Sequence, residues 1–81
     1  MGRRRKLKER ILSGKSDKNI PFEQTRTLLK SLGFTEDIVG SHYIYRREGL
    51  SRPVNIQQRG AKVPPYQVRQ IRRMLIDLGI E

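Results

Sequence analysis

The sequence predicts an α+β domain in which two helices cover one face of a three-stranded antiparallel sheet. Apolar residues recur at helical spacing in two segments, near residues 20–32 and 65–78. Between them lie three short extended segments separated by turn residues. A chain of 81 residues has room for one small core, which excludes a two-domain enzyme.

A short basic helix is expected in front of this domain. Segment 3–12 carries Leu7 and Ile11 four residues apart, which gives a narrow apolar stripe among many bases. Glycine, serine and asparagine then indicate a loop. We therefore divide the chain into a basic N-terminal extension and loop, 1–19, and a folded domain, 20–81.

Both helices of the domain have recognisable ends. The first begins near Pro21, where a missing amide hydrogen costs nothing, has Glu23 in its positive first turn, and ends at Gly33. The second follows Pro64-Pro65, which end the preceding loop, and it ends at Gly79. Their buried faces comprise Thr25, Leu28, Leu29 and Leu32 in the first helix and Val68, Ile71, Leu75 and Leu78 in the second.

Three strands are predicted at 34–39, 41–47 and 53–57, with turns at Gly40 and at Gly49. The third alternates apolar and polar residues, which is typical of a strand with one face on a core and the other in water. One face of this sheet can bury both helical stripes. The other face is expected to stay open.

The charge predicts a polyanionic partner. Lysine and arginine number 18 against 8 acidic residues, which gives a formal net charge of +10. Eight of the bases but only two of the acids fall within residues 1–18, so +6 lies there and +4 on the remainder. A basic extension that only improves solubility is the alternative.

Several classes of function and location are disfavoured. The sequence has no cysteine and a single histidine, so a disulfide framework or a zinc cluster lacks its ligands. The sequence shows no paired carboxylates of the kind that a glycosidase uses. It also shows no serine–histidine–aspartate set of the kind that a protease uses. No apolar stretch approaches the roughly 18 residues of a membrane span, and no signal region follows Arg3. We expect a cytoplasmic protein without a cofactor.

The densest chemical signal is Gly40-Ser41-His42 at the start of the middle strand. Histidine has an unperturbed pKa of ~6.5, so it can act as acid or base near neutrality. A half-exposed surface histidine is the alternative. Strand alternation puts His42 on one face with Ile44 and Arg46, and the tyrosines of the strand on the other. Either face could be the buried one, because both carry apolar residues.

Aromatic and basic residues suggest contacts with RNA. Tyrosines could stack on bases and cations could hold phosphates, although the tyrosines could equally pack at the margin of the core. The candidates for stacking are Tyr43, Tyr45 and Tyr66, and those for phosphates are Arg46, Arg47, Arg52, Lys62, Arg69 and Arg72. The predicted RNA-binding set is Gly40, Ser41, Tyr43, Arg46, Arg47, Lys62 and Arg69.

The chain resembles the HicA toxins of bacterial toxin–antitoxin systems over about residues 11–80. The resemblance is carried by the α-β-β-β-α order, by a late loop and by the end of the last helix. The residues concerned are Gly40-Ser41-His42 with Tyr43-Ile44-Tyr45, Pro64-Pro65 and Leu78-Gly79-Ile80. The segments 13–20 and 66–70 are similar to the subgroup with an N-terminal extension.

This resemblance implies a fold similar to the double-stranded-RNA-binding domain, ribosome-independent mRNA cleavage and a HicB-type antitoxin. The catalytic histidine of the family falls on His42. Many members have a second histidine where this chain has Tyr43. Without metal ligands, the economical reaction is attack of the ribose 2′-hydroxyl on the adjacent phosphate, with His42 as base or acid. A non-catalytic RNA-binding module and a protein-interaction domain are the alternatives.

Overall fold

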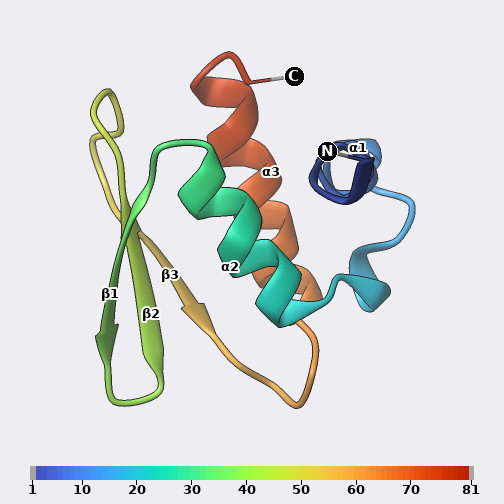
Figure 1. Cartoon of the computed structure of the whole chain (residues 1–81), viewed down its shortest axis with the longest axis horizontal. Helices are drawn as coiled ribbons and strands as arrows, with labels where there is room; N and C mark the ends of the chain where they lie inside the picture. Colours follow the sequence, from blue (N-terminus) through green and yellow to red (C-terminus); the bar gives the residue numbers. More distant parts are fainter. Residues whose placement is uncertain (1, 81) are drawn as a thin grey trace.

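The computed structural model describes residues 2–80 and has a three-stranded sheet on one side and helices on the other (Figure 1). Its elements in chain order are α1 (Gly2–Ser13), the 3-10 helix η1 (Asp17–Asn19), α2 (Phe22–Ser31), β1 (Thr35–Val39), β2 (His42–Arg46), β3 (Val54–Gln57) and α3 (Pro65–Asp77). The predicted α+β class, antiparallel sheet and element order are confirmed. No helix among residues 2–80 has the length and apolar character to cross a bilayer.

Local chemistry explains where α2 begins and ends. The Pro21 carbonyl accepts hydrogen bonds from the amide and the hydroxyl of Thr25, at 3.2 and 2.7 Å, and these close the first turn. At the other end Gly33 has φ +93°, a left-handed conformation that costs glycine little, and its amide bonds back to the Lys30 carbonyl. The helix therefore ends one turn before β1 begins.

The strands form an antiparallel sheet in the order β1-β2-β3, with β2 in the middle. Val39 pairs with His42, so only Gly40 and Ser41 connect β1 to β2. Gly40 has φ +60°, which fits a two-residue hairpin turn with glycine at its first position. The glycine of the Gly-Ser-His motif is thus required by the turn, and the histidine is the first residue of β2.

The core lies between the sheet and the α2–α3 pair. Tyr45 of β2 and Ile56 of β3 point into it and are almost fully buried. They belong to one cluster of buried apolar residues that draws on all three helices and the connecting segments and also comprises Leu7, Ile11, Ile20, Phe22, Leu28, Leu29, Phe34, Val63, Val68, Ile71, Met74 and Leu75. One continuous core therefore joins the sheet to the helices.

Helix α1 forms a third layer on the side of the α2–α3 pair away from the sheet (Figure 1). Leu7 and Ile11 are only 3% and 0% exposed, so the predicted apolar stripe is buried against the other helices. The Arg72 guanidinium of α3 donates a hydrogen bond to the Ile11 carbonyl at 3.0 Å and makes two to the Asp17 carboxylate at 2.9 and 3.1 Å. These hydrogen bonds lower the pKa of Asp17 below its ordinary value.

Candidate functional site

His42 lies on the outer face of the sheet, away from the helices, and its side chain is exposed. This follows from burial of Tyr45 on the same strand, because residues of even and odd number point to opposite faces. Of the two orientations that the sequence left open, the one with the tyrosines inside is therefore correct. His42, Ile44 and Arg46 share the open face.

The imidazole of His42 is held by Asn55 of β3. Its Nδ1 lies 3.2 Å from the amide oxygen of Asn55. An amide oxygen only accepts hydrogen bonds, so this contact requires the proton on Nδ1 and leaves the lone pair on Nε2. A neutral imidazole in this tautomer can take a proton from a bound molecule through Nε2. Asn55 was not among the predicted site residues.

Apolar residues flank His42 on the open face. Val39, its cross-strand partner on β1, is 61% exposed. Ile44 follows on β2 and is half-buried. On the other side His42 pairs in register with Gln57 of β3. The surroundings of the imidazole are thus the amide side chains of Asn55 and Gln57, one apolar patch and the exposed turn residues Gly40 and Ser41.

Tyr43 points to the helical side of the sheet, opposite to His42. Its ring packs edge-on against Phe22, with centroids 4.8 Å apart and an interplanar angle of 80°. The guanidinium of Arg26 lies over the same ring at 4.9 Å from its centroid. Tyr43 and its strand neighbour Tyr45 therefore pack in and beside the core. Of the three tyrosines, only Tyr66 on α3 is exposed.

Arg46 is on the open face but far from the imidazole. It lies four positions along β2 from His42, a distance of about 13 Å at ~3.3 Å per residue. Its guanidinium pairs with Asp37 of β1 at 3.0 Å. Arg47 lies on the other side, 5.8 Å from the centroid of the Phe34 ring. Both arginines line an open depression of about 380 Å³ formed with Gly33, Thr35, Glu48, Leu50, Ser51 and Pro53.

Lys62 and Arg69 lie elsewhere. The Lys62 ammonium donates a hydrogen bond to the side-chain oxygen of Asn19 at 3.0 Å, beside η1. Arg69 is exposed on α3, and its charge contributes to the lowered pKa of Asp17. The structure thus gathers Gly40, Ser41 and His42, with Arg46 on the same face. It does not bring Tyr43, Arg47, Lys62 or Arg69 to the imidazole.

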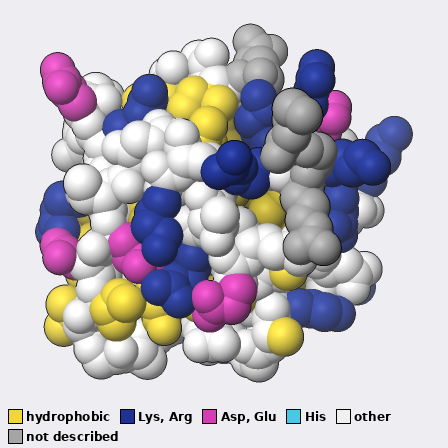
Figure 2. Space-filling model, viewed as in Figure 1, with side chains coloured by type: hydrophobic (Ala, Val, Ile, Leu, Met, Phe, Trp, Pro, Cys, Tyr) yellow, Lys and Arg dark blue, Asp and Glu magenta, His cyan; other side chains and the backbone are white. Residues whose placement is uncertain are grey.

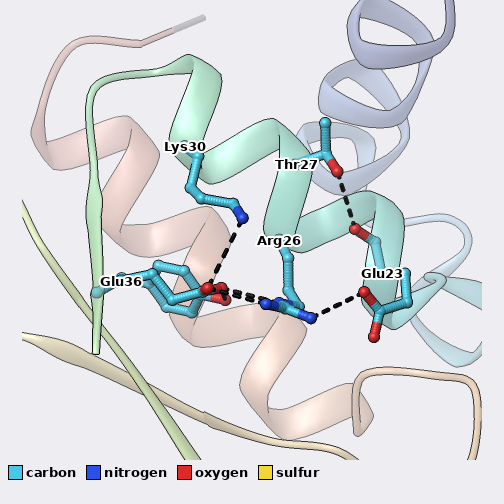
Figure 3. A network of polar contacts seen from close by, with 6 residues as sticks. Glu23, Arg26, Thr27, Lys30 and Glu36 are labelled. Atoms are coloured by element: carbon cyan, nitrogen blue, oxygen red, sulfur yellow. Dashed lines mark hydrogen bonds and ion pairs between the residues drawn. The ribbon is translucent and has the colours of Figure 1, made fainter. Parts of the chain in front are cut away.

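A partly buried polar network ties β1 and β2 to α2 (Figure 3). Glu36 of β1 accepts hydrogen bonds from Arg26 at 2.8 and 2.9 Å and from the Tyr45 hydroxyl at 2.6 Å. Arg26 also reaches Glu23 at 2.9 Å, and the Lys30 ammonium lies 3.7 Å from Glu36. These donors, Arg26 first, lower the pKa of Glu36 from 4.5 to about 2 against the opposing effect of burial.

The same network raises the pKa of Tyr45, first through burial and then through its hydrogen bond to the Glu36 carboxylate. The Tyr45 hydroxyl therefore stays protonated and donates to Glu36 throughout the neutral range. It serves to hold β2 against α2 and does not face the open side where His42 lies. Within residues 2–80, no three histidine, aspartate or glutamate side chains gather closely enough to hold a metal ion.

Comparisons with protein-family models, curated proteins and solved structures give no match for this chain.

Proposed function

We propose that the chain is a metal-independent endoribonuclease of the HicA toxin type, in which His42 carries the acid–base chemistry. The observation that carries this proposal is an exposed imidazole whose Nδ1 is held by Asn55, so that Nε2 is open to a bound molecule. The net charge of +10 supports a polyanionic substrate. The Gly40-Ser41-His42 motif supports the family.

In the proposed reaction RNA supplies its own nucleophile. His42 Nε2 takes the proton from a ribose 2′-hydroxyl, whose oxygen then attacks the adjacent phosphorus. The bond from phosphorus to the 5′-oxygen breaks, and this oxygen takes a proton from water. The products are a cyclic 2′,3′-phosphate and a free 5′-hydroxyl. General base catalysis of this kind contributes ~10²- to 10⁴-fold to the rate.

The described lysines and arginines are better placed to hold phosphates that flank the cleavage site than to hold the phosphate that reacts. None of the candidate arginines and lysines forms a hydrogen bond or ion pair with His42 in the described part of the chain. Arg46, about 13 Å along β2, is a candidate for a neighbouring phosphate if it leaves Asp37. With one imidazole and no cation against the scissile phosphate, we expect slow turnover.

An acidic HicB-type antitoxin is the proposed partner. The apolar side chains of Val39 and Ile44 beside His42 would give such a protein an anchor on the open face. A partner bound there would cover the imidazole. Substitution of Val39 by lysine should then weaken the complex, and co-expression of the antitoxin should restore growth of cells that produce the chain.

The experiment that tests this function compares the wild-type chain with His42→Ala in a bacterium and follows growth and mRNA integrity. Growth arrest and mRNA loss should require His42. The purified chain should also leave 5′-hydroxyl and cyclic 2′,3′-phosphate ends and should stay active in EDTA. Products with 5′-phosphate ends, or activity that needs added magnesium, would overturn the mechanism.

One observation favours a second function, a non-catalytic RNA-binding module. The basic side chains are spread over α1, α3 and both sides of the sheet, as expected for sequence-independent contacts with phosphates. Turnover distinguishes the two functions. A module of this kind would bind RNA with strong salt dependence and leave it intact.

A further inference from the structure

The exposed side of α1 is strongly basic. Arg4, Arg5 and Lys6 are all exposed, and Glu9 is the one acidic residue of the helix. Arg5 and Lys6 form no hydrogen bond or ion pair within the described chain. Figure 2 shows lysine and arginine side chains gathered at the right of the molecule, where α1 lies in Figure 1.

This basic side is held in a fixed place and is not a loose tail. Leu7 and Ile11 anchor the inner side of α1 in the core. Arg72 fixes the C-terminal end of the helix through the Ile11 carbonyl, and Arg10 donates to the Asn19 carbonyl in η1. A ligand that binds here meets cations on a helix backbone already held in place by the fold, so no entropy is lost in ordering that backbone on binding.

The α1 surface and His42 lie on opposite sides of the molecule. The sheet, the α2–α3 pair and α1 follow one another as three layers (Figure 1), and His42 is on the outer face of the sheet. The molecule measures 29 × 28 × 23 Å, so the two surfaces are separated by most of its width. A group that touches α1 therefore does not touch the imidazole.

We infer that the outer side of α1 is a separate docking surface for the sugar–phosphate backbone of RNA, remote from the cleavage site. The inference rests on the proposed function for its substrate class. The surface would raise the affinity of the protein for RNA molecules that are long enough to reach from His42 to α1. It would leave the rate of the chemical step unchanged. Long RNA would contact both surfaces, whereas a dinucleotide would contact the His42 side alone.

The composition of the surface favours RNA over an acidic protein. The exposed residues of α1 from Arg4 onward are charged or small and polar, and none is apolar. Specific protein interfaces have an apolar or aromatic centre, whereas phosphate contacts need only cations and hydrogen-bond donors. Such contacts read no sequence, so the docking is expected to be independent of RNA sequence.

The test measures binding of a long single-stranded RNA as a function of salt. The protein is the full chain with His42→Ala, so that the RNA stays intact and binding is measured without cleavage. Arg5→Gln with Lys6→Gln removes two charges while leaving Leu7 and Ile11 in place. Each phosphate contact contributes ~0.7 to the slope of log affinity against log salt, so we expect a slope about 1.4 smaller.

Arg59→Gln with Arg73→Gln is the matched control. It removes the same charge from exposed side chains outside α1 and should leave the slope within error of the parent. An unchanged slope in the α1 variant, or an equal decrease in the control, would overturn the inference. The inference would also be overturned if the α1 variant lost binding to an acidic protein but kept the RNA binding of the parent, because the surface would then serve a protein partner.

Cleavage of a dinucleotide in the His42-containing chain separates this inference from the proposed function. If both hold, Arg5→Gln with Lys6→Gln leaves the dinucleotide rate unchanged and weakens only long RNA. If the chain does not cleave RNA but the α1 variant still lowers the salt slope, the docking surface stands and the nuclease proposal fails. A decrease in the dinucleotide rate would contradict the separation of the two surfaces.

Discussion

Replacing Glu36 by glutamine tests how much the partly buried network of Figure 3 stabilises the fold. The side chain is 10% exposed, and its pKa is lowered from 4.5 to about 2. A displacement of this size corresponds to about 3 kcal/mol of folding free energy. Because the folded-state pKa is the lower one, this stability is present above about pH 4.5 and is lost as the pH falls towards 2.

Urea unfolding followed by circular dichroism between pH 7 and pH 2 measures the effect. Glu36→Gln should be less stable by about 3 kcal/mol at pH 7, and the difference should fall below about 0.5 kcal/mol at pH 2, where about half of the wild-type carboxyl groups are protonated. Glu23→Gln is the control, because that partner of Arg26 is 69% exposed and its loss should cost under about 0.5 kcal/mol. A Glu36→Gln deficit that does not change with pH would refute the electrostatic explanation.

Three further substitutions test other parts of the structure. Ile11→Ala should cost about 2–5 kcal/mol in urea unfolding, because the side chain is 0% exposed; a neutral effect would mean that α1 is not part of the core. Gly40→Ala should cost about 1–2 kcal/mol from its φ of +60° alone, since an added Cβ meets no atom within 4 Å; Ser41→Ala is the control and should be neutral. Asn55→Asp places a negative charge beside the imidazolium and should move the rising limb of the pH–rate profile for RNA cleavage upward by about one pH unit. An unshifted profile would remove Asn55 from the positioning of His42.

The ends of the helices and strands could be predicted because local residues determine them. Pro21 and Gly33 bracket α2, and the apolar spacing of α3 predicts its buried face. The hairpin between β1 and β2 could be predicted from Gly40, because few other residues adopt the backbone conformation that a two-residue turn requires at this position. These signals act within a few residues, so a single sequence contains them.

The orientation of β2 and the neighbours of His42 could not be predicted. Both faces of β2 carry residues that can be buried. In the structure Tyr45 is the buried residue, and its hydroxyl donates a hydrogen bond to Glu36. The alternation of β3 does place Asn55 on a polar face, but only the register between strands brings it to His42. Contacts of this kind depend on tertiary pairing.

The place of α1 also depends on tertiary packing. Its narrow apolar stripe predicts a helix, but the stripe does not say which surface will cover it. The side chain of Arg72 is the additional determinant, because it joins α3 to both Ile11 and Asp17. In the sequence this arginine is one of many bases, and it was predicted to hold phosphate. Its two carboxylate contacts and one carbonyl contact instead give it a structural role.

The single-turnover rate of RNA cleavage by purified protein shows whether His42 performs acid–base chemistry on RNA. His42 is exposed and makes one side-chain hydrogen bond in the described structure, so His42→Ala should unfold at the wild-type urea midpoint. This folded variant should cleave RNA at least about 100-fold more slowly than the wild type at saturating enzyme. Cleavage by the folded variant at the wild-type rate would show that His42 does not perform this chemistry.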